Sequence, residues 1–117
     1  MFKEVYLKLK EKGFDVYSVG QQVGEFPNGY IVIMEMGDIA TSNKVGVIGR
    51  IDLYCYYPFN NYSEVADWRE SIIDSVLELR GYKQIYEASN IIVDDSKTAY
   101  QFKLSFSLKK RKKEGRY

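Results

Sequence analysis

The chain contains no histidine and only one cysteine, Cys55. The sequence therefore lacks the side chains that most zinc sites need, and it lacks the histidine of every Ser-His or Cys-His catalytic pair. A single cysteine cannot form an internal disulfide, which fits a reducing compartment. We expect a protein that is not an enzyme and that holds no cofactor or metal.

The sequence also has no long apolar run. No stretch approaches the ~20 consecutive apolar residues that a membrane helix requires, and the opening residues, MFKEVYLKLKEK, are charged throughout, unlike a signal peptide. The length of 117 residues suits one domain, and the apolar share of 45% and charged share of 28% are typical of globular chains. We expect a soluble protein, made in a cytoplasm, with no membrane partner.

Two segments have the apolar spacing of amphipathic helices. Residues 2–12 place apolar side chains three and four positions apart, and Gly13 follows where a helix would end. Ser63 is a natural N-cap for a second, longer helix, which Gly81 would end. The apolar stripe of this second helix comprises Val65, Trp68, Ile72, Val76 and Leu79.

Three longer runs have the composition or alternation of β-strands, and shorter β-prone runs accompany them. Residues 30–36 are nearly continuously apolar, residues 45–57 alternate between an apolar and a polar, aromatic face, and residues 100–108 alternate without a miss. The run at 45–57 is long enough that it must bend at Gly49 or project beyond the body. We predict an α+β fold, with an antiparallel or mixed sheet of about five strands and two helices packed on one face.

The net charge of +1 is unevenly distributed. Residues 109–117 carry six basic residues and one acid, whereas residues 1–108 carry eleven basic and fifteen acidic residues. We therefore divide the chain into a single α+β domain, residues 1–108, and a basic C-terminal tail, residues 109–117. The candidates for electrostatic contact in this tail are Lys109, Lys110, Arg111, Lys112 and Lys113.

The basic tail has three interpretations. It is a solvated terminus, it contacts nucleic-acid phosphates, or it pairs with the acidic surface of another subunit. A cationic cluster without interleaved aromatic residues lacks the stacking side chains of a single-strand binder. We therefore do not expect sequence-specific recognition of nucleic acid.

Tyrosine occurs 11 times, and an aromatic run surrounds the end of the strand predicted at 45–57. Large amphipathic rings suit protein contacts, although tyrosine is also a common half-buried strand residue that a second layer of the same chain can cover. Because two helices cover only one face of such a sheet, we expect a neighbouring chain on the other. The acidic side of the second helix offers a complementary patch. The candidate subunit interface comprises Tyr54, Tyr56, Tyr57, Phe59, Tyr62, Glu70, Asp74 and Glu78.

One group of acids has a faint catalytic pattern. Asp94 and Asp95, followed by Gln101 and Lys103, echo the acids and lysine of metal-dependent nucleases. Gln101 stands where that pattern has an acid, and Asp-Asp-Ser-Lys is an ordinary turn sequence. A nuclease is therefore a much weaker interpretation than a protein without catalysis.

The order of these segments resembles that of a known family. The carrying segments are RIDLYCYYPFNNYSEVADWRESIIDSVLEL at residues 50–79 and AYQFKLSFSL at residues 99–108. Together with the N-terminal helix, they resemble the small tail terminator proteins of long-tailed bacteriophages, also called tail-to-head joining or minor tail proteins. Phage-derived contractile particles carry similar caps.

The resemblance implies a structural virion protein that assembles into a ring, commonly a hexamer. Such a ring caps the tail tube, ends its polymerisation and joins the tail to the head. The implied partners are copies of the chain itself, the tail tube protein and a head–tail connector or sheath protein, in a particle made in a bacterial cytoplasm. DNA that passes through the particle is a further implied partner, which the protein would contact non-specifically. The alternative is a small DNA-associated protein of a mobile element that binds nucleic acid non-specifically through the basic tail.

Overall fold

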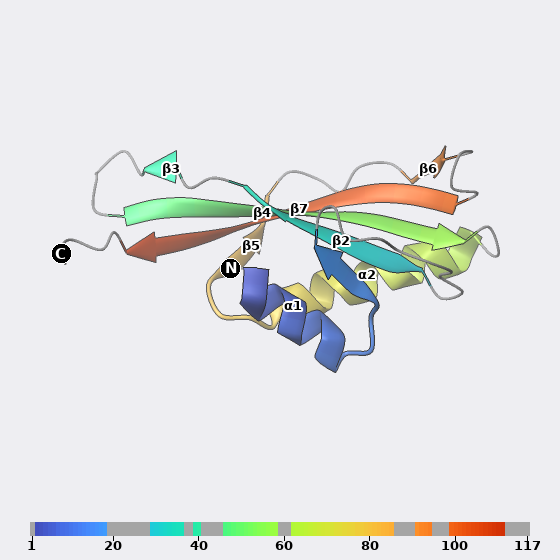
Figure 1. Ribbon diagram of the computed structural model, residues 1–117, viewed down its shortest axis with the longest axis horizontal. Helices are drawn as coiled ribbons and strands as arrows, with labels where there is room; N and C mark the ends of the chain where they lie inside the picture. The colour runs from blue at the N-terminus through green and yellow to red at the C-terminus, as the bar shows by residue number, and fades with distance from the viewer. Residues whose placement is uncertain are drawn as a thin grey trace.

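The computed structural model describes residues 2–18, 29–36, 39–40, 46–58, 62–85, 91–94 and 99–111, and they form an α+β fold (Figure 1). Its elements, in chain order, are α1 (Phe2–Glu11), β1 (Val16–Ser18), β2 (Tyr30–Glu35), β3 (Ile39–Ala40), β4 (Gly46–Pro58), α2 (Tyr62–Leu77), β5 (Tyr82–Gln84), β6 (Ile92–Asp94) and β7 (Ala99–Arg111). The predicted fold class is confirmed.

The strands of this described part form one seven-stranded mixed sheet. Five of them follow the order β1-β2-β4-β7-β5, while β3 pairs with β4 and β6 pairs with β7. Only β1 and β2 run parallel; the other pairs are antiparallel. The centre of the sheet is the β4–β7 pair, matched over 13 residues from Gly46 with Arg111 to Pro58 with Ala99.

Both helices lie on the same face of the sheet, as the sequence predicts (Figure 1). Their apolar stripes supply Val5 and Leu9 from α1 and Val65, Ile72 and Val76 from α2, all fully buried. Buried side chains at every second position of the central strands pack against these helix residues, because successive strand residues point to opposite faces of the sheet. These sheet residues are Ile31, Ile33, Ile51, Leu53, Cys55, Phe102, Leu104 and Phe106.

Both ends of the second helix differ from the sequence signals, whereas α1 ends as predicted. Gly13 has a positive φ of 92°, the left-handed conformation expected just beyond a helix. Gly81 also has a positive φ, of 88°, but α2 ends at Leu77, so Gly81 lies in the turn that leads to β5 and does not end the helix. The second helix begins at Tyr62, two residues before Glu64, where a Ser63 cap would start it. Ser63 therefore lies in the first turn of α2.

Two strands differ from the predicted pattern. The polar segment after β2 contributes the two-residue strand β3, which pairs Ile39 with Ile48 of β4. Strand β7 continues to Arg111, because Lys109, Lys110 and Arg111 pair with the first residues of β4. The first three residues of the basic tail are thus strand residues, and residues 112–117 lie outside the described part of the chain.

The molecule is elongated, with extents of 50 × 26 × 25 Å. The paired ends of β4 and β7 near Gly46 and Arg111 reach beyond both helices (Figure 1). The long strand therefore projects, which was one of the two predicted outcomes. Among the described residues, no helix is long and apolar enough to cross a membrane.

Candidate subunit interface

The sheet face opposite the helices, here called the open face, carries the other half of each central strand. Register places Tyr54 opposite Lys103 and Val32, and Tyr56 opposite Gln101 and Tyr30. No helix of the described chain lies on this face (Figure 1). Most of its side chains are half-buried rather than fully exposed: Tyr17, Val32, Met34, Arg50, Tyr54, Tyr56, Gln101, Lys103 and Ser107.

The predicted tyrosines divide between the two faces. On the open face, the ring of Tyr56 stacks on Tyr30 at 4.8 Å between centroids, and the ammonium of Lys103 lies 5.9 Å from the centroid of Tyr54. Tyr57 points to the helix side, where its ring is 5.0 Å from that of Trp68. The alternation of a strand imposes this split. Tyr54 and Tyr56 share one surface, and Tyr57 belongs to another.

An ion pair occupies the middle of the open face. Asp52 is only 1% exposed, and both of its carboxylate oxygens accept hydrogen bonds from Arg50. The Arg50 Nε–Oδ1 distance is 3.0 Å and the Nη2–Oδ2 distance is 3.2 Å, a bidentate arrangement. The alternation of residues 45–57 predicts that Asp52 lies on the polar face of the strand. It does not predict that the Arg50 guanidinium binds this carboxylate.

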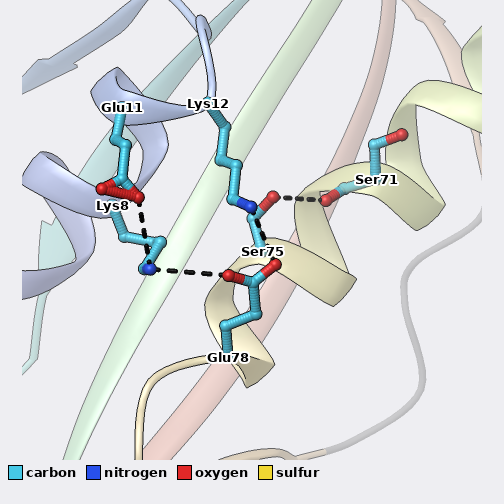
Figure 2. Close-up of polar contacts among 6 residues, drawn as sticks. All are labelled: Lys8, Glu11, Lys12, Ser71, Ser75 and Glu78. Atoms are coloured by element: carbon cyan, nitrogen blue, oxygen red, sulfur yellow. Dashed lines mark hydrogen bonds and ion pairs between the residues drawn. The ribbon is translucent and has the colours of Figure 1, made fainter.

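The predicted acidic patch on α2 is only partly available to a partner. Glu70 and Asp74 are exposed. Glu78, just after the helix, is bound by α1: Lys12 Nζ lies 2.9 Å from one carboxylate oxygen and Lys8 Nζ lies 3.5 Å from the other (Figure 2). The hydrogen bond from Lys12 lowers the pKa of Glu78, reinforced by the Lys12 charge and by Lys8, against an opposing effect of burial. Glu78 joins α1 to α2 within the subunit.

The basic candidates begin at the projecting end of β7. Lys109 is exposed there, and Lys110 and Arg111 follow in the strand. Lys112 and Lys113 lie outside the described residues, as does Phe59. Tyr62 begins α2, but its side chain is outside the described part. The structure thus places Tyr54 and Tyr56 on the open face, with Lys109 at the projecting end of that same face, and the acids of α2 on the helix side.

An aromatic pocket, absent from the sequence predictions, lies where the α1–β1 turn meets α2 and the end of β4. Its volume is about 360 Å³, and its lining residues are Lys12, Gly13, Phe14, Asp15, Tyr57 and Trp68. The Trp68 ring is 6.4 Å from Phe14 and 5.0 Å from Tyr57, between centroids, and is steeply inclined to both. No local pattern could reveal this pocket, because its rings come from three distant segments.

The hydroxyl of Tyr57 donates a hydrogen bond of 3.5 Å to Glu64 near this pocket. Burial raises the pKa of Tyr57, and the charge and hydrogen bond of Glu64 act in the same direction. The phenol therefore stays neutral, next to a carboxylate. The lining of the pocket combines three aromatic residues with one acid, Asp15, and one cation, Lys12.

The acids of the nuclease pattern are not brought together as a described site. Gln101 and Lys103 lie on the open face, Asp94 ends β6, and Asp95 is outside the described residues. Within the part of the chain that the structure describes, no three His, Cys, Asp or Glu side chains are grouped to hold a metal ion. Cys55 is fully buried in the core, and burial raises the pKa of its thiol well above the usual value. It packs as a small apolar side chain.

Searches against protein families and against curated proteins find no match to this chain.

Proposed function

We propose that this protein is a structural subunit of a phage or phage-like tail that assembles into a ring, commonly of six copies, and terminates the tail tube. The observation that carries the proposal is the one-sided sheet: both described helices cover one face, and the other presents Tyr54, Tyr56 and their half-buried neighbours. Sheets that bury both faces are completed by a second layer, and here a neighbouring copy supplies it.

The unlike surfaces of the subunit, its open face and the acidic side of α2, favour a ring over a two-fold dimer. A head-to-tail contact joins unlike patches, and a chain of such contacts closes into a ring when the rotation between copies allows it. Helix α2 carries four acids, Glu64, Asp67, Glu70 and Asp74, against the single cation Arg69. The projecting end of β7 is basic through Lys109, Lys110 and Arg111. These opposite charges lie on different parts of the subunit and suit contact between copies.

In a tail, such a ring would stack on the tube protein on one side and meet the head connector or sheath protein on the other. The resemblance in sequence pattern to tail terminators supports these partners. Non-catalytic assembly also agrees with the absence of histidine and with a buried, unreactive Cys55.

The test compares two matched substitutions by sedimentation over a range of protein concentrations. Tyr54→Glu puts a charge on the open face, where Lys103 lies opposite and can pair with it inside the monomer. Leu7→Glu makes the control at a side chain that is 54% exposed on α1. We expect Tyr54→Glu to raise the assembly concentration at least about tenfold and Leu7→Glu to leave it unchanged.

If both variants assemble at the same protein concentration as wild type, the open face is not part of the subunit interface. A wild-type chain that stays a 13.6 kDa monomer, and that binds DNA with an affinity falling steeply with salt, would favour the DNA-associated alternative instead.

A further inference from the structure

The aromatic pocket has the chemistry of a cation site. Phe14, Tyr57 and Trp68 line it, with the Trp68 ring inclined by 66° to Phe14 and by 51° to Tyr57, and Asp15 is the acid of the lining. Aromatic faces attract ammonium and guanidinium groups, tryptophan most strongly, and a neighbouring carboxylate adds charge attraction. The one cation in the lining, Lys12, has its ammonium 2.9 Å from Glu78.

The chain itself contains a matching ligand. After Arg111, the end of β7, the sequence continues with Lys112, Lys113 and Arg116. Both lysine ammonium and arginine guanidinium groups suit a pocket lined by aromatic residues and an acid, and arginine also stacks on flat rings.

This segment cannot reach the pocket of its own subunit. Arg111 pairs with Gly46 at one end of β4, and Tyr57 lies eleven residues along that strand, or roughly 36 Å away at about 3.3 Å per residue. Arg116 is five residues beyond Arg111, so its Cα reaches at most about 18 Å from it, even when fully extended. The pocket of a second copy carries no such restriction.

We infer that the aromatic pocket of one subunit binds a basic side chain from residues 112–116 of the next, and that this contact is one of those that join the ring. The inference rests on the proposed ring assembly and specifies one contact within it. The contact is head-to-tail, since the pocket and Arg111, after which the basic segment begins, lie at opposite ends of the β4–β7 pair.

Two full-length variants separate the two halves of the contact. Asp15→Lys reverses the charge at the pocket, at an exposed side chain. The triple change Lys112→Glu, Lys113→Glu and Arg116→Glu removes the ligand. Trp68 is the only tryptophan in the chain, so its emission reports directly on the pocket.

Each variant alone is expected to lose the concentration-dependent change in Trp68 emission that accompanies assembly of the wild type. A mixture of the two regains part of it, because the basic segment of the Asp15→Lys chain can still bind the intact pocket of the triple variant. Lys3→Glu, a charge reversal at an exposed position of α1, is the matched control and retains the wild-type response.

The outcomes distinguish this inference from the proposed function. If the triple variant forms rings with an unchanged Trp68 response, the pocket contact is wrong, whereas the proposed ring assembly is retained. A mixture that shows no more response than its two components also overturns the contact. A wild-type chain that never assembles contradicts the proposed function itself.

Discussion

At the scale of single residues, the Arg50–Asp52 pair is a bidentate ion pair on the open face. Asp52 is 1% exposed, and the Arg50 side chain, which satisfies both of its oxygens, is 27% exposed. A buried carboxylate that loses its partner keeps the cost of leaving water, whereas replacing both partners by apolar groups is often neutral.

We therefore expect Arg50→Met to lower the free energy of unfolding by about 2 kcal/mol. The double variant Arg50→Met with Asp52→Leu should recover much of that loss, because it removes the buried charge as well. Urea denaturation of the single and double variants measures both values. An equal loss in the two would show that Asp52 does not need the guanidinium.

Gly29, just before β2, is held in a left-handed conformation against the end of β4. Its φ is 84°, and a Cβ there would lie 2.8 Å from Cδ1 of Tyr57 and 2.9 Å from the carbonyl oxygen of Tyr56. Gly13 has a similar φ of 92°, but a Cβ there would meet nothing within 4 Å. An alanine at either glycine would have a strained backbone, because φ is positive at both. Only at Gly29 would the added Cβ also lie too close to neighbouring atoms.

Gly13→Ala should therefore cost about 1 kcal/mol from the backbone alone, and Gly29→Ala clearly more, because the added methyl also clashes with backbone. Thermal unfolding of the two variants compares them directly. Equal losses of stability in the two variants would contradict the close approach of Tyr56 and Tyr57 to Gly29.

At the scale of elements, α1 and α2 are joined by the ion cluster of Lys8, Lys12 and Glu78 (Figure 2). The pKa of Glu78 is below its usual 4.5 in the folded chain. A carboxyl with a lowered pKa stabilises the fold above its unfolded pKa, and that contribution is lost as the pH falls through the folded value.

We expect Glu78→Gln to lower the melting temperature slightly at pH 7 and low salt, because it removes the charge that binds both lysines. The difference from wild type should shrink below about pH 4 and at high salt, since protonation and screening remove the same attraction. Asp74→Asn, an exposed acid on the same helix, is the control and should change the melting temperature less. A Glu78→Gln effect that is constant with pH would contradict an electrostatic role.

Long periodic segments were predictable from the sequence. The alternation at 45–57 and 100–108 identified the two central strands and their apolar faces, because one buried face fixes which residues point inward. The apolar stripes of α1 and α2 were equally clear. The parallel pairing of β1 with β2 was not, since three residues carry no signal of strand direction.

The candidate site was harder to predict because its contacts join distant segments. Helical spacing grouped Glu78 with Glu70 and Asp74, but the docking of α1 brought Lys12 to Glu78. Similarly, Trp68 was assigned to an apolar stripe, whereas the structure also places it beside Phe14 and Tyr57 in a pocket. Such neighbours follow from how the helices pack on the sheet, which periodicity does not specify.

At the scale of the whole molecule, the subunit is elongated, 50 Å along its longest axis, and its faces differ in chemistry. Its helices cover one face of the sheet, tyrosines line part of the other, and a basic strand end projects beyond the helices (Figure 1). The projecting end is a narrow three-stranded ribbon of β3, β4 and β7, with no described helix packed on it. A sheet this narrow is stabilised when further layers cover it. Neighbouring copies would provide those layers.

Electron micrographs of the purified wild-type protein in negative stain, over increasing concentration, test this arrangement most directly. Our account predicts closed rings of one diameter, built from several 13.6 kDa subunits, that form more readily at low salt than at high salt. Single particles no longer than one subunit at every concentration, or open filaments of indefinite length, would contradict it.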